Sequence, residues 1–332
     1  MAEYQNKPGS FAPRGQKKRK INKDGVLTLC FIALIAIIVI VLIVFLVKAI
    51  VGQSGPTQTT PPTTDSTVDS SSSSPNSSSS SIGLIPSGYS TIDLKYSGIY
   101  SGNLILVDDV NAYKPVSENN IVSLYKQAGW GVSYRLRNSQ IGLDADVIPA
   151  FSSMLSAMRT AFAGSLQAGD YFLIQSAAPT SNSTAVIDYN NENTAGYSFD
   201  IRVFLASKKT RKLNDAEQTW LAENCASYGF VLRYDEGKED KTGVTADLYH
   251  FRYVGIPHSL YMKANNLCLE EYLDLVKNYS YASPLVISTG TSTYNVYYVK
   301  AVGSSTKAYI PSGSIYTISG NNTDGFIITV TK

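Results

Sequence analysis

The stretch WLAENCASYGFVLRY at residues 220–234, followed by YHFRYVG at 249–255, decides the fold. Asn214 precedes it, with Glu217 three residues further on, which is the capping-box pattern that begins a helix. Gly229 is the residue type that ends helices, and the segments at 230–234 and 249–254 have the β-branched and aromatic residues typical of strands. A helix that ends at a glycine and passes into a strand indicates an α+β domain, in which helices pack on an antiparallel sheet.

Apolar spacing extends this pattern towards both ends of the domain. Short apolar runs predict strands at 104–107, 171–175 and 198–205, and spacing predicts helices at 118–128, 146–167 and 269–277. In the longest helix Val147, Phe151, Met154, Leu155 and Met158 recur on one face, which we interpret as core and not as a cofactor site. We assign residues 83–283 to this domain.

The pattern changes after Pro284. Five short alternating runs, separated by Gly, Ser and Asn turns, occupy the last part of the chain. They predict a small all-β appendage at residues 284–332.

The N-terminal segment differs from the rest in composition. Residues 26–47 contain no charge and are long enough for a transmembrane helix, since about 20 residues cross the hydrocarbon core. A buried helix or a cleaved signal are the alternatives, but no A-x-A site follows the run. Residues 1–25 are basic, which predicts a cytoplasmic tail and an extracellular C-terminal part. The Ser, Thr and Pro residues that dominate 48–82 predict a disordered linker between this single-pass anchor and the domain.

Charge and cysteine content exclude several classes of protein. The net charge of +2, with no basic groove interleaved with aromatics, argues against a nucleic-acid partner. Three cysteines cannot build a disulfide scaffold, and Cys225 and Cys268 form either one disulfide or two free thiols. Only two histidines are present, so a site that needs several imidazoles is hard to build.

Two polar stretches carry the candidate chemistry, at residues 191–200 and 247–255. In the second, Asp247 stands three residues before His250, so a carboxylate and an imidazole are available to one cavity. Asp200, on a different predicted strand, is a candidate for a second metal ligand. The alternative is that Asp200 caps a turn and His250 is a hydrogen-bonded core residue.

At these positions the chain resembles the zinc D-alanyl-D-alanine carboxypeptidases of the vancomycin-resistance type, which are relatives of the peptidoglycan endopeptidases. The resemblance extends over about 104–278 and is carried by WLAENCASYGFVLRY at 220–234, GKEDKTG at 237–243, HFRYVG at 250–255 and LCLEEYL at 267–273. It implies a zinc site that hydrolyses the terminal peptide bond of peptidoglycan stem peptides.

The metal motif of this family is Ser-x-His-x-x-Gly-x-Ala-x-Asp, followed later by Glu-x-Trp-His. The resemblance places Asn193, Asp200 and His250 at the three zinc-ligand positions and Asp247 at the position of the general base. Asn191, Gly196, Ser198 and Tyr249 take the Ser, Gly, Ala and Trp positions. We assign Ser198, Tyr249 and Arg252 to substrate binding.

The departures from the motif fall on the chemistry. Asn193 offers an amide oxygen where zinc prefers imidazole, and Asp247 is one methylene shorter than Glu. After YFLIQ the family has Ser-Gly-Tyr-Arg-Ser, whose Arg binds the substrate carboxylate, whereas this chain has SAAPT at 176–180.

Replacements for the altered groups are present nearby in the sequence. Glu192 or Asp188 is available as a ligand for a harder metal, and Arg202 or Arg252 is available for the carboxylate. We expect His258, the other histidine, to cap a helix.

The sequence therefore predicts a membrane-anchored, extracellular carboxypeptidase-like protein of the cell envelope that is catalytically impaired or inactive and binds peptidoglycan stem peptides or an envelope protein. An active metallo-carboxypeptidase with altered ligands is the alternative, and a spacer domain is a third interpretation. Zinc is the cofactor if the chain is active, and otherwise none is expected.

Overall fold

The computed structural model describes residues 85–116 and 120–332. Among these residues no helix combines the length and the apolar character needed to cross a bilayer. The predicted tail at 1–25, span at 26–47 and linker at 48–82 lie outside the described residues. The boundaries between these segments therefore stay predictions. The boundary predicted at Ser283, between the domain and the appendage, also stays a prediction.

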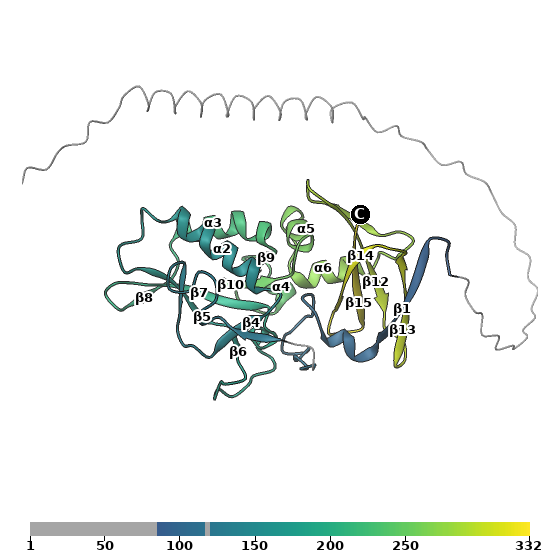
Figure 1. The fold of residues 1–332 in the computed structure, drawn as a ribbon, viewed down its shortest axis with the longest axis horizontal. Helices are drawn as coiled ribbons and strands as arrows, with labels where there is room; N and C mark the ends of the chain where they lie inside the picture. The colour runs from purple at the N-terminus through teal and green to yellow at the C-terminus, as the bar shows by residue number, and fades with distance from the viewer. Residues whose placement is uncertain (1–84, 117–119) are drawn as a thin grey trace, which may run out of the picture. The chain divides into compact units, whose positions relative to one another are not determined.

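The predicted α+β fold is confirmed, and its centre is a mixed sheet (Figure 1). The strand order is β3-β5-β7-β10-β9, with β8 beside β7. All pairs are antiparallel except β3 with β5. The strands are β3 (Tyr134–Leu136), β5 (Tyr171–Ser176), β7 (Ser198–Phe204), β8 (Thr210–Arg211), β9 (Phe230–Tyr234) and β10 (Asp247–Tyr253).

Helix α2 (Ile148–Ala161) covers one face of this sheet (Figure 1). Its residues Phe151 and Leu155 are fully buried in one cluster with Phe199 and Ile201 of β7. Because side chains alternate along a strand, Ser198, Asp200 and Arg202 point to the opposite side, which we call the site face. The predicted helix at 146–167 is thus confirmed over its central part only.

Helix α3 (Asp215–Asn224) starts as predicted. The Asn214 side chain accepts a hydrogen bond from the backbone N–H of Glu217, whose carboxylate accepts one from the backbone N–H of Asn214. The 3-10 helix η3 (Cys225–Tyr228) follows and ends at Gly229, whose φ is 84°. A Cβ at Gly229 would lie 2.7 Å from the Tyr253 ring, so this turn requires glycine.

Two predictions of local structure are wrong. The run at 104–107 is not a strand, although Leu104, Ile105 and Val107 are buried, because its carbonyls bind side chains instead of a neighbouring strand. Within the predicted helix at 118–128, the described residues 120–128 form strand β2 (Ile121–Ser123) and turns instead. In both places the apolar residues signalled burial but not the backbone conformation.

The remaining elements connect these parts. A second sheet has the order β2-β4-β6, all antiparallel. The elements are β4 (Ile141–Asp144), β6 (Ala178–Pro179), η1 (Tyr96–Tyr100), η2 (Glu192–Ala195), α4 (Glu239–Thr242), α5 (His258–Ala264) and α6 (Leu269–Val276).

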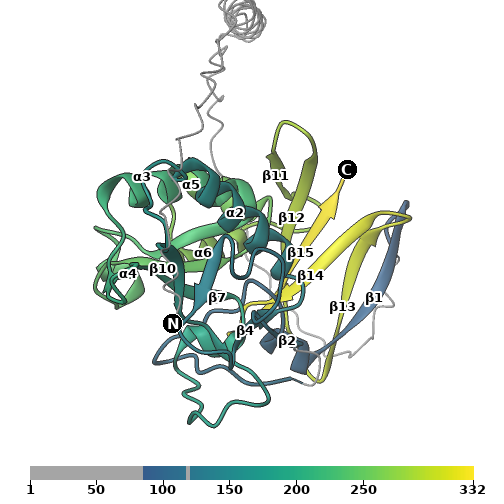
Figure 2. The ribbon, with the colours of Figure 1, turned by 60° about the vertical axis from the view of Figure 1, so that its left-hand side comes forward.

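The predicted C-terminal all-β region is confirmed, but it includes a strand from the other end of the described chain. Strand β1 pairs with β13 over seven residues, and Figure 2 shows the two side by side. Four other strands form a sheet in the order β11-β12-β15-β14. The strands are β1 (Tyr89–Lys95), β11 (Leu285–Ser288), β12 (Thr293–Lys300), β13 (Ser305–Pro311), β14 (Ile315–Gly320) and β15 (Gly325–Thr331).

Strand β15 is buried on both faces. Ile327 packs in one cluster with Tyr272 and Val276 of α6, whereas Ile328 packs with Leu94 of β1. The C-terminal sheet therefore packs directly on helix α6 of the preceding domain.

Candidate functional site

The structure brings together three of the predicted site residues, Asn193, Asp200 and His250. Asn193 lies in η2, and Gly196 ends that turn with a φ of 85° before β7 begins. A Cβ at Gly196 would collide with Ile121, so glycine is required for the chain to enter β7 at this point. Asp200 and His250 are directly opposite each other in the pair β7–β10.

Both ring nitrogens of His250 contact carboxylates. Nδ1 lies 2.7 Å from Oδ1 of Asp200, and Nε2 lies 2.9 Å from Oε2 of Glu192. The ring also lies against Tyr234, with 5.1 Å between ring centroids. An ionised carboxylate has no proton to donate and acts only as an acceptor, so both nitrogens of His250 act as donors.

Glu192 is the centre of a buried ionic cluster. Its Oε1 accepts from Nε of Arg233 at 2.8 Å and from Nη1 of Arg252 at 2.7 Å. Arg233 in turn makes a two-pronged pair with Glu270, at 2.7 and 3.0 Å. Arg252 is fully buried and also donates to the backbone carbonyls at 103 and 105. Three carboxylates, including Asp200, thus face three cations, including His250.

Hydroxyl and amide groups complete the hydrogen bonding of Asp200. The Asn193 amide donates to Oγ of Ser176 at 3.1 Å and more weakly to Oδ2 of Asp200 at 3.4 Å. Its amide oxygen accepts from Oγ of Ser198 at 2.7 Å. The Ser176 hydroxyl donates to Oδ2 of Asp200. Both carboxylate oxygens of Asp200 and both ends of the Asn193 amide are therefore engaged.

These contacts set the charges of the cluster. Burial opposes a charge on His250, but the hydrogen bonds that the ring donates to Asp200 and Glu192 outweigh it and raise the pKa of the imidazole to about 9. Burial likewise opposes the charge of Glu192, yet Arg233 and Arg252 hold the pKa of that carboxyl well below its usual range. The pKa of Asp200 is also lowered, since His250 outweighs burial. His250 is therefore an imidazolium at neutral pH.

Asp247 and Tyr249 lie outside this cluster. The Asp247 carboxylate accepts a hydrogen bond from the backbone N–H of Tyr249 at 3.0 Å. No hydrogen bond or ion pair in the described part of the chain joins Asp247 to Asp200 or His250. The Tyr249 ring contacts Arg202, whose guanidinium carbon lies 4.2 Å from the ring centroid.

The sequence suggested Arg252 as a partner for the substrate carboxylate and Glu192 as a replacement metal ligand, but the structure places neither side chain for that role. Arg252 is enclosed with Glu192 and so is not available to a substrate carboxylate, and Glu192 is held by two arginines. Asp188 accepts a backbone hydrogen bond from Asn190 in an exposed turn. Sequence reasoning missed Arg233 altogether. The signal was a charged residue in the apolar strand run FVLRY, because a buried charge needs a partner.

A small pocket, which we call the centre pocket, adjoins the cluster. It measures about 160 Å³, and its polar lining includes Asn138, Gln140, Ser176, Asn191 and Asn193. Asp188 is the only charged residue among its lining residues. The pocket therefore offers amide donors and acceptors and no cation.

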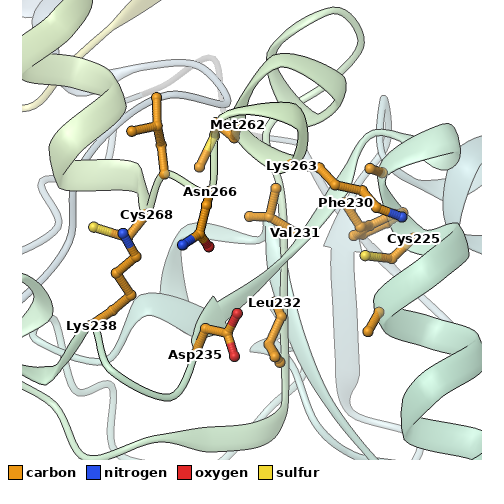
Figure 3. Close-up of a pocket in the computed structure, with 13 residues that line it drawn as sticks. Cys225, Phe230, Val231, Leu232, Asp235, Lys238, Met262, Lys263, Asn266 and Cys268 are labelled. Atoms are coloured by element: carbon orange, nitrogen blue, oxygen red, sulfur yellow. The ribbon is translucent and has the colours of Figure 1, made fainter.

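A second pocket of about 160 Å³ contains the two described cysteines. Figure 3 shows Cys225 and Cys268 on opposite sides of it, with Val231 and Leu232 between them. Both thiols are free, and burial raises the pKa of Cys225 to about 11. Of the two alternatives left open by the sequence, the structure has the pair of free thiols.

A family of proteins matches the part of the chain that carries the cluster. The family described as VanY, D-alanyl-D-alanine carboxypeptidase, matches residues 178–256. This range includes Asn193, Asp200 and His250, and excludes the C-terminal sheet.

Individual relatives extend the likeness over most of the chain. A D-alanyl-D-alanine carboxypeptidase of Enterococcus faecium is 32% identical over 244 residues, which are 70% of this chain and 76% of the relative. The bifunctional D-Ala-D-Ala dipeptidase and carboxypeptidase VanXYC of Enterococcus gallinarum is 52% identical over 48 residues, 14% of this chain and 25% of that protein. The solved structure of the vancomycin-resistance D,D-dipeptidase VanXYg with a D-Ala-D-Ala phosphinate analogue shares the fold, with a TM-score of 0.59 and 24% identity over 74% of this chain and 99% of that one.

Proposed function

The chain belongs to the D-alanyl-D-alanine carboxypeptidase family, and from this premise we propose that it binds peptidoglycan stem peptides without hydrolysing them. The observation that carries the proposal is the engagement of both nitrogens of His250 by carboxylates. Binding is supported by the pocket beside the cluster, and loss of hydrolysis by the chemistry of the cluster.

The residues at the three metal-ligand positions do not fit zinc. A zinc-bound imidazole must be neutral and must present a lone pair, whereas both nitrogens of His250 donate hydrogen bonds. Asn193 directs its NH₂ group towards Asp200, and its oxygen is occupied by Ser198. Among the described residues no group of three or more His, Cys, Asp or Glu side chains has the arrangement of a metal site.

The cluster also has no unbalanced charge that a cation would neutralise. The carboxylates of Glu192 and Asp200 are each paired with His250, and Glu192 has two arginines in addition. In the same way Glu192 is unsuitable as a replacement ligand, since a metal there would lie against the guanidinium groups of Arg233 and Arg252. Asp247 is not in contact with the cluster and so is not positioned as a general base for it.

The centre pocket supports peptide binding. Its amide side chains both donate and accept, which matches the backbone of a peptide. Its volume of about 160 Å³ suits small side chains such as that of alanine. Val186 and Ile187, which are exposed, provide an apolar rim.

The test uses the full-length chain and a synthetic stem pentapeptide ending in D-Ala-D-Ala. We expect saturable binding in calorimetry, and no D-alanine release above the uncatalysed rate with or without added zinc. An Asn193→Leu variant, whose larger side chain fills the pocket, should bind the peptide more weakly. Catalytic release of D-alanine by the purified chain would reject the proposal in favour of an active metallo-carboxypeptidase with altered ligands.

We also propose that the domain is held outside the cell by one membrane helix. The support is the uncharged run at 26–47 with basic residues before it. Protease added to intact cells that produce the chain should then remove an epitope after Lys332 and spare one before Met1. Protection of the C-terminal epitope in intact cells would contradict this topology.

A further inference from the structure

Another pocket, different from the one that contains the cysteines, lies next to the centre pocket, beside strands β3 and β5. We call it the arginine pocket; it measures about 400 Å³ and its lining includes Arg135, Arg137, Tyr171, Leu173 and Phe204. The two pockets adjoin just after β3, since Arg137 lines one and Asn138 the other. They also follow each other along β5, from Leu173 to Ser176.

Strand register places Arg135 and Arg202 on the site face, while Arg137 follows β3 and lines the arginine pocket with Arg135; Arg202 lies outside that lining. Arg135 pairs with Leu173, and Leu173 pairs with Arg202, so the two arginines stand in one row across β3, β5 and β7. With strands about 5 Å apart, their Cα atoms are about 10 Å from each other, and Arg137 follows two residues, about 7 Å, after Arg135. Arg202 is two residues from Asp200, which puts this row next to that of the ionic cluster.

These three cations have no acidic partner among the described residues. None of Arg135, Arg137 and Arg202 forms an ion pair with a carboxylate in the described ranges, unlike Arg211, Arg233 and Arg252. The lining of the arginine pocket contains no Asp or Glu. A cationic row of this kind is complementary to an oxyanion, for which the arginine fork offers two parallel hydrogen bonds.

Aromatic rings hold two of the guanidinium groups in place. The guanidinium carbon of Arg135 lies 4.4 Å from the centroid of Tyr171, and that of Arg202 lies 4.2 Å from that of Tyr249. A guanidinium placed over a ring keeps its N–H edge free, and its side chain has less freedom to lose when a ligand binds.

We propose that Arg135, Arg137 and Arg202 form a carboxylate site that binds the C-terminal carboxylate of a peptide whose last residues occupy the centre pocket. The proposal rests on the peptide binding proposed above and assigns its recognition to residues outside the metal-ligand positions. It also explains how a chain without an arginine in SAAPT at 176–180 can hold a peptide carboxylate.

A peptide suits these two pockets better than a phosphate polymer does. The arginine pocket adjoins a pocket of amide side chains, which recognise a peptide backbone, and the lining of that second pocket contains no cation.

The test compares two synthetic pentapeptides that end in D-Ala-D-Ala, one with a free carboxylate and one with a C-terminal amide. Binding to the full-length chain is measured by calorimetry, with short-chain inorganic polyphosphate as a third ligand. The variants are Arg135→Gln, Arg202→Gln and the conservative Arg135→Lys. Lys300→Gln, which removes an exposed cation of the C-terminal sheet, is the matched control.

We expect amidation to weaken binding to the unaltered chain about tenfold, which is the usual effect of losing a charge-assisted hydrogen bond. In Arg135→Gln and Arg202→Gln the free acid should bind about tenfold more weakly, and amidation should then have little further effect. Arg135→Lys should restore only part of the affinity, and Lys300→Gln should bind like the unaltered chain.

Each other outcome rejects a different statement. Equal binding of acid and amide, or full affinity in both arginine variants, would overturn the carboxylate site while leaving peptide binding intact. Tighter, arginine-dependent binding of polyphosphate would overturn the peptide as the ligand. Failure of the unaltered chain to bind either pentapeptide would reject the proposed function itself, and the carboxylate site with it.

Discussion

The only two histidines of the chain lie in two regions with opposite electrostatics. His250 is enclosed by Asp200 and Glu192, which raise its pKa to about 9. His258 lies where α5 and α6 meet β15, and it contacts the hydroxyls of Tyr272 at 2.6 Å and Thr329 at 3.1 Å. Burial without a charged partner lowers the pKa of His258 to about 3. The comparison shows that burial alone keeps an imidazole neutral, whereas burial between carboxylates keeps it protonated at neutral pH.

The two regions also differ in what they connect. The His250 cluster joins η2, β7, β9 and β10 through ion pairs and occupies the positions where the family resemblance implies a metal. The His258 region joins the carboxypeptidase-like domain to the C-terminal sheet through neutral hydrogen bonds. His258 does not cap its helix as expected from the sequence, because its ring is directed into this contact.

The change Glu192→Gln should produce the largest effect on this comparison. It leaves His250, Arg233 and Arg252 buried without the carboxylate that they share, and the loss of one partner of a buried ion pair costs about 3–5 kcal/mol. Urea unfolding followed by fluorescence of Trp130 and Trp220 measures the loss.

Glu270→Gln is the control for this experiment. Glu270 pairs with Arg233 at the edge of the cluster and its side chain is 16% exposed, against 2% for Glu192. We expect a smaller loss, because water can replace part of that pair. Equal losses in the two variants would show that Glu192 is not the centre of the cluster.

The pH dependence of unfolding should separate the two histidines by sign. His250 has a higher pKa in the folded chain than in the unfolded one, so its contribution is complete below about pH 6.5 and is lost as the pH rises through 9. This amounts to about 3 kcal/mol. His258 has a depressed pKa, so the folded chain binds fewer protons and loses about 2 kcal/mol between pH 7 and pH 5.

Variants identify the source of each slope. His250→Gln should flatten the alkaline side of the profile and leave the acid side, whereas His258→Gln should do the reverse. An alkaline slope that persists in His250→Gln would mean that this imidazole is not charged in the folded chain.

Thr329→Val should give the smallest of these effects. It removes one hydrogen-bond partner of His258 while Tyr272 stays, so we expect a loss of about 1 kcal/mol in unfolding free energy. Thr331→Val, on the same strand but less buried, is the matched control and should change it by less. If the two changes are equal, the contact between Thr329 and His258 contributes nothing measurable.

Local sequence patterns correctly predicted the elements whose structure depends on residues close to one another in the sequence. The capping box of Asn214 and Glu217, the turn at Gly229 and the buried stripe of α2 all formed as expected. The pairing of β1 with β13 joins segments more than 200 residues apart, and nothing in either segment specifies the other. The run at 104–107 was misread because burial, and not sheet pairing, selects its apolar residues.

The candidate site was also predictable only in part, because some of its contacts depend on tertiary packing. The family resemblance located Asn193, Asp200 and His250, which the fold brings together. It did not reveal Arg233 and Glu270, whose pairing with Glu192 depends on strand β9 and helix α6 packing beside η2. Electrostatic balance in the cluster is a property of the folded chain, since it depends on which charges are buried together.

Zinc binding by the full-length chain tests the central claim most directly. The purified chain is incubated with excess zinc, dialysed against zinc-free buffer at pH 7.5 and examined by elemental analysis, with an Asp200→Asn, His250→Gln double variant as the blank. The charge-balanced cluster predicts far less than one zinc per chain and no difference from the blank. One zinc per chain that is lost in the double variant would contradict the account.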